Sequence, residues 1–447
     1  MKLLKTAILM AMMLMIAAPF ATAGACGADC KEACCEKADI VVYGSARHRL
    51  EIDGKSFDKD ANMDWMQYMR TRLGVKASRG NSGMVFEVQD SRVLGDTPGT
   101  LNGTFTNGNS FENFYYDGPY KNIGGYANDF GVRQAYLWHN PCEKGSIKVG
   151  RFGVNMHNQR LVGEVNWDQV GRTTEGLMFK RSLNDNVSII GGALQIAEQN
   201  FDNGDDNATD PMFYMLDLNL SEQNVDFFMY LLSGGSDLFF DSDYSAGRSD
   251  DVSLMTFGAY SSREFGSNLF YDAMVAMQTG TYEEWATGGD TTDLSGMMLN
   301  LEVGMNMESG TTVSALVDYT TGDDSTTDEY EAFNNLLYTG HKWNGYMDFF
   351  NGSYGNGDNG LTDIAVRVAH PINETLWVKA DAHMFSSTEE YADGKSSIGN
   401  ELDITLVKKA GSMKIKGGLS FFMANEDWAG ADAATAKWAF LQSSFGF

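Results

Sequence analysis

The stretch Met69-Arg-Thr-Arg-Leu-Gly-Val-Lys76 is the part of the sequence that decides the fold. Met69, Thr71, Leu73 and Val75 alternate in it with Arg70, Arg72, Gly74 and Lys76. Successive side chains of a β-strand point to opposite faces, so this pattern predicts a strand with different surroundings on its two faces. One face meets an apolar environment and the other meets water.

The same alternation recurs along the chain after residue 40. Further segments with this pattern are 252–261, 294–307, 361–370, 376–385, 402–409 and 415–423. Short separators, which predict hairpin turns, are 79–83, 141–145, 184–186, 223–224, 373–375 and 411–413. Long separators, rich in Gly, Asn, Asp and Thr, are 97–129, 200–210, 239–251, 281–293 and 320–360. Alternating short and long connections are typical of a transmembrane barrel with tight periplasmic turns and long extracellular loops.

We therefore predict an all-β fold, a transmembrane antiparallel β-barrel of about 18 strands over residues 40–447. Proline cannot donate to a strand ladder, and the prolines after the first twenty residues support this division of the chain. They fall in the expected loops, turns or strand starts: Pro98, Pro119, Pro141, Pro211 and Pro371. The final residues alternate up to Phe447, as the last strands of outer-membrane barrels commonly do. An extracellular β-sandwich or β-solenoid is the soluble alternative.

Composition excludes two other classes of protein. The 447 residues are 43% hydrophobic and include 27 Phe and 19 Tyr, which is far more apolar surface than a disordered chain carries. After the first twenty or so residues, no apolar run approaches the roughly 18 to 20 residues that a membrane-spanning helix needs. A disordered chain and a helical membrane protein are both excluded.

The first residues predict export from the cytoplasm. Lys2 and Lys5 precede an apolar stretch over 7–20, and Ala21-Thr-Ala23 has the small-x-small form of a signal-peptidase site. We expect a signal peptide over 1–23, a periplasmic cysteine-rich segment over 24–39, and localisation in the bacterial outer membrane.

The cysteines cluster in that short segment. They are Cys26, Cys30, Cys34 and Cys35, with Cys142 alone in a predicted periplasmic turn. An exported protein favours one or two disulfides in the segment, and a disulfide from the segment to Cys142 is a further hypothesis. No CxxC or CxxCH motif is present, so a metal or haem site is disfavoured and no cofactor is predicted.

Charge is unevenly placed along the chain, whose formal net charge is -27. Residues 182–341 contain only Arg248 and Arg263 as basic residues, whereas 22 of the 33 Lys and Arg fall in residues 1–181. The arginines in or beside expected strands there are Arg47, Arg49, Arg70, Arg72, Arg92, Arg133, Arg151, Arg160 and Arg172.

Alternation directs Arg47, Arg49, Arg70 and Arg72 toward the lumen, since an arginine facing lipid at mid-bilayer costs about 2–4 kcal/mol. For Arg133, Arg151 and Arg172 the alternation is ambiguous, and a lumen position is a guess. Opposite charges 7 Å apart attract by about 0.6 kcal/mol in water and about 2.4 kcal/mol at a dielectric constant of 20, so several arginines could hold an anion without trapping it. Alternatively, carboxylates such as Glu87, Asp90 or Asp168 neutralise them and set only the pore shape.

Two kinds of long loop allow both a functional and a structural interpretation. The 97–129 loop carries Phe105, Phe111, Phe114, Tyr115, Tyr116, Tyr120 and Tyr126. These rings could stack on sugars if the loop folds inward, or form an aromatic belt or simple loop packing. The acidic runs 202–210 and 323–331 could bridge divalent cations to lipid phosphates or lipopolysaccharide, or be merely solvated.

Short motifs stand out at Val149-Gly150-Arg151, 158–163, Trp167, Gly171-Arg172-Thr173, 334–338 and 341–350, with weaker ones at 70–73 and 89–96. These segments resemble the alginate export family of outer-membrane β-barrels. Over residues 40–447 the resemblance implies an 18-stranded monomeric barrel that acts as a passive conduit with a basic lumen for an anionic polysaccharide. The cysteine-rich segment and the scarcity of basic residues in the middle of the chain depart from that pattern.

The sequence thus favours an outer-membrane channel for anionic solutes, such as an acidic polysaccharide or oligosaccharide, and not an enzyme. Arg160, Trp167, Arg172, His341 and Lys342 would shape loops at its mouth. The alternatives are a general diffusion porin, a barrel sheath for a periplasmic protein, and an outer-membrane hydrolase. The six histidines are scattered and neither HExxH nor GxSxG occurs, which disfavours the hydrolase. Nucleic acid is not an expected partner.

Overall fold

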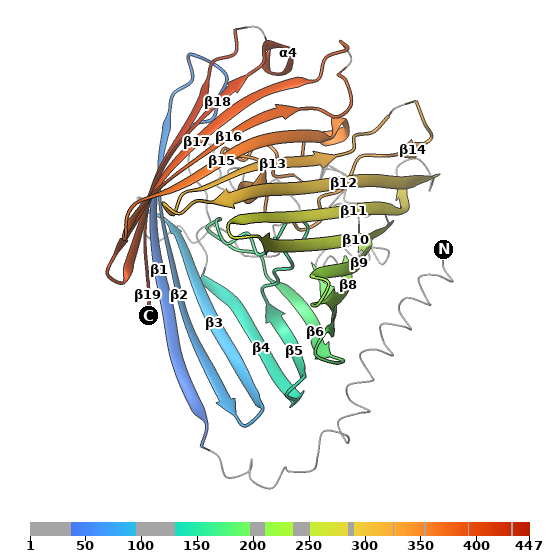
Figure 1. The fold of residues 1–447 in the computed structure, drawn as a ribbon, viewed down its shortest axis with the longest axis vertical. Helices are drawn as coiled ribbons and strands as arrows, with labels where there is room; N and C mark the ends of the chain where they lie inside the picture. Colours follow the sequence, from blue (N-terminus) through green and yellow to red (C-terminus); the bar gives the residue numbers. More distant parts are fainter. Residues whose placement is uncertain are drawn as a thin grey trace.

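The structure is a computed structural model that describes residues 37–94, 130–196, 211–235, 251–284 and 290–447, apart from 325, 353, 354, 392 and 431. Long antiparallel strands dominate it (Figure 1). The first nine are β1 (Asp39–Gly54), β2 (Asp64–Arg79), β3 (Ser82–Val93), β4 (Phe130–Cys142), β5 (Gly145–Phe152), β6 (Thr174–Ser182), β7 (Val187–Gln195), β8 (Met212–Leu220) and β9 (Val225–Gly235). The others are β10 (Asp251–Phe265), β11 (Leu269–Glu284), β12 (Asp290–Asn306), β13 (Thr312–Thr320), β15 (Leu361–Asn373), β16 (Leu376–Ser386), β17 (Ser397–Ala410), β18 (Met413–Ala424) and β19 (Ala436–Gly446).

The strands close into a barrel. Each pairs with its neighbours in sequence, and β1 pairs antiparallel with both β2 and β19, with Arg49 opposite Gln442. The two-residue strand β14 (Glu329–Tyr330) is the exception, since it pairs in parallel with β12. Without β14, the 19-stranded sheet is a closed barrel of 18 strands. The predicted fold class and strand count are confirmed.

Short and long connections alternate as predicted. The short ones are 80–81, 143–144, 183–186, 221–224, 266–268, 307–311, 374–375 and 411–412. The others are 55–63, 94–129, 153–173, 196–211, 236–250, 285–289, 321–360, 387–396 and 425–435. The long separator expected over 281–293 is wrong, because β11 and β12 extend into it and leave only 285–289 between them.

Two prolines differ slightly from their expected places. Pro141 and Pro371 lie inside β4 and β15, close to the end of each strand. The pairing register shifts at both places, between His139 and Cys142 and between Pro371 and Asn373. A proline without an N–H is accommodated where the ladder is already interrupted.

The outer face of the barrel is apolar. Large hydrophobic side chains such as Leu73, Val75, Met277, Val366 and Leu419 are exposed, while their neighbours along each strand point inward. In a closed barrel, an exposed apolar band is the surface that contacts lipid. This surface and the barrel fold place the chain in the bacterial outer membrane. No helix in the described part of the chain is long and apolar enough to cross a membrane.

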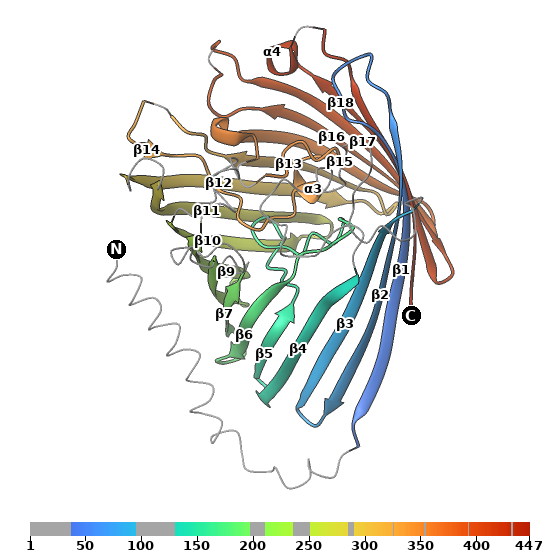
Figure 2. The same ribbon diagram turned by 180° about the vertical axis from the view of Figure 1, so that it is seen from behind.

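Two long connections fold into the barrel interior. We name residues 153–173 the first internal loop and residues 321–360 the second internal loop (Figure 2). The second carries the short helices α3 (Gly340–Trp343) and η3 (Gly357–Asn359), whereas α4 (Glu426–Ala429) lies between β18 and β19. Val162 and Leu337 form a parallel bridge between the two loops. Leu161, Val162, Phe333 and Leu337 join the larger buried apolar cluster.

The expected N-terminal segments cannot be placed in this fold. The signal peptide, Cys26, Cys30, Cys34 and Cys35 lie outside the described residues, as do the aromatic residues of the 97–129 loop. Cys142 is half-buried at the end of β4, beside the short turn where it was expected, and has no disulfide partner within the described part of the chain. The hypotheses on disulfide pairing therefore stay predictions.

Candidate functional site

Arginines from β1 and β2 form a cluster on the inner wall. Arg70 and Arg72 share the inward face of β2 with the buried Tyr68, and Leu73 and Val75 point outward, as the alternation predicted. Arg47 and Arg49 of β1 are also buried on the inner side, and Arg47 lies directly opposite Arg70 in the strand pairing.

The first internal loop lies against this cluster through its backbone carbonyls. Arg47 donates to the carbonyl oxygens of Asn166, Trp167 and Asp168 at 3.0, 2.8 and 2.7 Å. Arg70 donates to those of Asn166 and Asp168 at 3.1 and 2.8 Å, and Arg49 donates to that of Trp167. All three carbonyls therefore each accept hydrogen bonds from two arginines, which fixes the loop against the wall.

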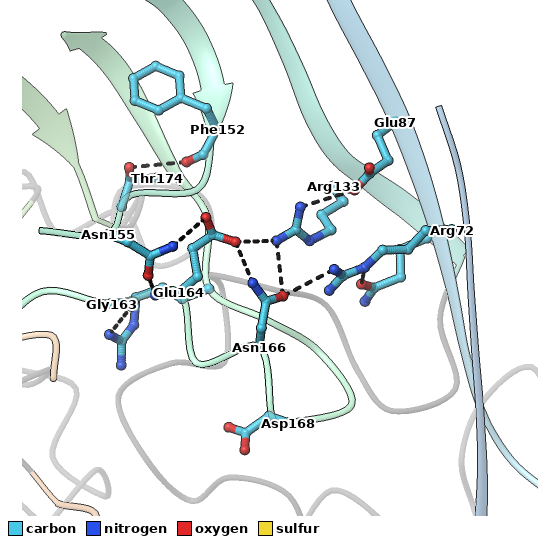
Figure 3. Close-up of polar contacts among 12 residues, drawn as sticks. Arg72, Glu87, Arg133, Phe152, Asn155, Gly163, Glu164, Asn166, Asp168 and Thr174 are labelled. Atoms are coloured by element: carbon cyan, nitrogen blue, oxygen red, sulfur yellow. Dashed lines mark hydrogen bonds and ion pairs between the residues drawn. The ribbon is translucent and has the colours of Figure 1, made fainter. Parts of the chain in front are cut away.

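The side chain of Asn166 extends the cluster toward β4 (Figure 3). Its Oδ1 accepts hydrogen bonds from Arg72 at 3.1 Å and from Arg133 at 3.3 Å, and its Nδ2 donates to Glu164 at 2.7 Å. Arg133 is buried, and the register between β3 and β4 shifts beside it, between Glu87 and Val88. This β-bulge explains why alternation could not assign its facing.

Carboxylates neutralise only part of the cluster. Arg49 pairs with Glu51 at 3.0 Å, and Arg133 pairs with Glu87 at 3.0 Å and Glu164 at 2.6 Å. Arg72 instead donates to Gln89 at 2.7 Å and to Asn166. Among the described residues, every hydrogen bond of Arg70 and Arg72 goes to a neutral oxygen. Carboxylates thus neutralise Arg49 and Arg133, which is one alternative from the sequence, whereas Arg70 and Arg72 keep their charge for an anion, which is the other.

An aromatic stack joins the wall to both internal loops. The guanidinium of Arg49 lies 3.8 Å from the Trp167 ring centre, and the His341 ring stacks on Trp167 with centroids 4.1 Å apart. Tyr346 stacks in turn on His341, at 4.7 Å. His341 Nδ1 also lies 2.9 Å from Asp348. Burial raises the pKa of Asp348, but the charge and hydrogen bond of His341 outweigh this, so the pKa lies below its ordinary value.

Arg160 and Lys342 connect the loops to each other and to the far wall. Arg160 is 1% exposed and donates to both carboxylate oxygens of Asp318 on β13, at 2.9 and 3.0 Å, and to Asn335 at 2.9 Å. Lys342 donates to the Asn158 carbonyl at 2.8 Å. Arg160 was expected at the mouth of the solute path, but its burial, its ion pair with Asp318 and its hydrogen bond to the second internal loop make it a structural clamp.

Arg172 is also a link between the loops. Its Nη1 donates to the Gly163 carbonyl at 2.8 Å and to the Leu337 carbonyl. The adjacent backbone bonds, from Gly163 N to Leu337 O and from Leu337 N to Leu161 O, are both 2.9 Å. Arg172 therefore stabilises the pairing of the two internal loops.

Two arginines expected in the path lie on the outer face instead. Arg92 follows the buried inward Ser91 on β3 and pairs with Asp90 at 2.8 Å. Arg151 precedes the buried inward Phe152 on β5 and pairs with Glu175 at 2.6 Å. Neither stretch carries a clear apolar alternation, and each arginine is accommodated outside by its carboxylate partner. The expectation that they line the lumen is wrong.

Inward lysines were also missed in the sequence, four of them on β16 to β18. Lys379 shares the inward face of β16 with His383 and Phe385. Lys409, Lys414 and Lys416 occupy inward positions on β17 and β18, where Lys409 lies opposite Lys414. Lys414, Lys379 and Arg49 are near enough for their charges to act on Lys416. The alternation in 376–385, 402–409 and 415–423 was recognised and was sufficient to find them.

The inner wall also carries buried carboxylates, several of them paired with a cationic or histidine side chain. Buried inward carboxylates occur on strands from β8 to β17: Asp217, Asp318, Asp363, Glu401 and Asp403. Two of them, Asp217 and Asp318, come from residues 182–341, which contain only Arg248 and Arg263 as basic residues. The uneven charge along the sequence therefore becomes, in part, an unevenly charged lumen. The described residues hold no group of three or more His, Cys, Asp or Glu arranged to bind a metal ion.

These features define a class: the chain has the fold of an outer-membrane porin, with a barrel narrowed by internal loops. No protein-family model matches the sequence, and no curated protein matches it. OccAB4 of Acinetobacter baumannii has a similar structure, with a TM-score of 0.60 at 10% identity over 91% of this chain and 98% of that one. A BenF-like porin from Pseudomonas fluorescens Pf-5 has a TM-score of 0.57 at 12% identity over 92% and 98%.

A third similar structure was solved with a ligand. It is OccK2 (OpdF) of Pseudomonas aeruginosa in complex with glucuronate, with a TM-score of 0.57 at 11% identity over 92% of this chain and 98% of that one. At these identities the likeness concerns the fold. The alginate export family suggested by short segments of the sequence finds no match among the family models.

Proposed function

We propose that this protein is a passive outer-membrane channel that prefers small anionic solutes, with no chemistry performed on them. The observation that carries the proposal is the pair Arg70 and Arg72, which face the lumen and bond only neutral oxygens among the described residues. A guanidinium remains protonated at any physiological pH, so both positive charges act on a passing solute.

The inward lysines support the same proposal. Lys379, Lys414 and Lys416 continue the basic wall from Arg49 toward the short-turn side of the barrel. Successive sites of moderate attraction let an ion enter and still leave, which is the condition for conduction.

The size of the solute follows from the internal loops. Because the two loops are tied to each other and to opposite walls, they narrow the interior to a path suited to small molecules. Glucuronate, which is bound in the OccK2 structure, is a suitable test solute because it carries one carboxylate. A uronate polymer, as the resemblance to alginate exporters implies, would have to pass the same loops as an extended chain. We place it second.

Liposome swelling tests the proposal. Proteoliposomes are exposed to glucuronate, glucose and glucosamine, which have similar size but negative, neutral and positive charge. We expect the swelling rates to fall in that order. Fastest entry of glucosamine would contradict the proposal, and equal rates would favour a general diffusion porin. Alginate oligomers of increasing length, added as competitors, separate the small-solute channel from a polysaccharide conduit.

A further inference from the structure

We propose that Asn166 occupies, with its own side chain, the position that a solute carboxylate takes at Arg72 and Arg133. This inference rests on the proposed function and identifies the residue that sets its selectivity. The amide oxygen of Asn166 accepts one hydrogen bond from each of these two arginines, which belong to β2 and β4. A carboxylate oxygen is the natural acceptor for two converging guanidinium groups.

The orientation of the amide is fixed by its other contact. Asn166 Nδ2 donates to Glu164 at 2.7 Å, so Oδ1 must be the atom that faces the arginines. Glu164 is held by Asn155, whose side chain donates to one Glu164 carboxylate oxygen at 2.9 Å and accepts from the Glu164 N–H at 2.8 Å. The amide oxygen is therefore presented to the arginines by a supported framework.

The amide is the weaker partner for these arginines. Its bonds of 3.1 and 3.3 Å are longer than the 2.6 Å from Arg133 to Glu164 and the 2.7 Å from Arg72 to Gln89. In addition, Arg72 Nη2 is buried without a hydrogen-bond partner. A carboxylate adds the Coulomb attraction of an ion pair to the hydrogen bonds that the neutral amide accepts from the guanidinium groups, so an entering carboxylate can displace the amide.

The displacement requires no movement of the loop. The backbone carbonyl of Asn166 is held by Arg47 and Arg70, at 3.0 and 3.1 Å, whereas its side chain is exposed to the lumen. Rotation of this one side chain is therefore sufficient to open the subsite. The Asn166 side chain therefore competes with a solute carboxylate for the two arginines and shortens the time that the anion stays bound.

Single-channel block by gluconate tests the inference. Asn166→Ala removes the competitor, so we expect gluconate to bind about two- to tenfold more tightly, as for one net hydrogen bond. Asn166→Asp places a negative charge there and should weaken binding about threefold. Asn356→Ala is the matched control, because Asn356 is an asparagine of the second internal loop whose side chain donates to Gly360 and Tyr391 and contacts neither arginine, and it should leave gluconate affinity close to that of the unchanged protein.

Reversal potentials measured in the same bilayers under a salt gradient separate the role of Asn166 from the proposed function as an anion channel. Equal gluconate affinity in all four proteins, in channels that still prefer chloride, would overturn the role of Asn166 and leave the proposed function standing. Parallel loss of affinity in Asn166→Ala and Asn356→Ala would also overturn it, since that result indicates a general loosening of the internal loops. Preference for potassium in the unchanged protein would overturn the proposed function itself.

Discussion

The two internal loops are held by opposite kinds of side chain. In the first, the carbonyl oxygens of residues 166–168 accept hydrogen bonds from wall arginines. In the second, the N–H groups of Tyr346 and Met347 donate to Asp403 and Glu401 on β17, at 3.3 and 2.9 Å, although Arg367 also donates to the carbonyls of Lys342 and Trp343.

The difference shows how charge is arranged in the lumen. The loop backbone carries no net charge, so the wall side chains that bind it keep most of their own charge. The wall beside the first internal loop is therefore basic, whereas the wall beside the second carries both buried carboxylates and Arg367. An anion is attracted to the first side, which sets the expected position of the solute path.

The largest effect is expected where the two loops meet. Arg160→Ala leaves Asp318 buried without its cation, and breaking a buried ion pair in this way costs about 3–5 kcal/mol. We expect a marked fall in the denaturant midpoint of the refolded barrel in detergent, and noisier conductance as the loops separate. A variant with unchanged midpoint and steady current would refute the role of Arg160 as a clamp.

The two modes of attachment should respond differently to single substitutions. Glu401→Ala leaves the buried Met347 N–H without the Glu401 carboxylate, at a cost of about 1–3 kcal/mol. Arg70→Ala should cost less than about 1 kcal/mol, because Arg47 still donates to the same two carbonyls. Urea unfolding of both variants measures the difference. A reversed order would show that the arginines do not support the first loop redundantly.

The second internal loop should also respond to acid. The pKa of Asp348 is lowered in the folded state, so its pairing with His341 contributes stability above the ordinary aspartate pKa and loses it as the pH falls through the lowered value. Below about pH 4 we expect more conductance fluctuation than at pH 7. Asp348→Asn should fluctuate more at pH 7 and change less with acid. An identical pH response in the variant would exclude this pair as the cause.

The smallest effect is expected on the outer face. Arg151 pairs with Glu175 away from the lumen, and exposed pairs of this kind contribute about 0–1 kcal/mol. Arg151→Ala should leave ion selectivity unchanged and stability nearly so, as judged by reversal potential and denaturant midpoint. A clear loss of chloride preference would show that Arg151 lines the solute path after all.

Much of the fold could be predicted from the sequence because lipid and water impose a strict two-residue period on each strand. That period placed Arg70 and Arg72 correctly and could have placed Lys414 and Lys416. It failed at Arg133, where a bulge shifts the register, and at Arg92 and Arg151, where polar or glycine neighbours hide the apolar face.

The candidate site could be predicted only in part. Asn166 lies more than ninety residues from Arg72 along the chain, and no local pattern indicates their contact. The pairing of Val162 with Leu337 is more distant still. Such contacts arise from barrel closure and from loops folding inward, which a strand-by-strand period does not contain.

The most direct test of the account is the reversal potential of the unchanged protein and of the Arg70→Gln/Arg72→Gln double variant under a potassium chloride gradient. We predict that the unchanged channel prefers chloride and that the double variant loses most of this preference while remaining folded. Potassium preference in the unchanged protein, or the same chloride preference in both, would contradict the claim that these two arginines select the solute.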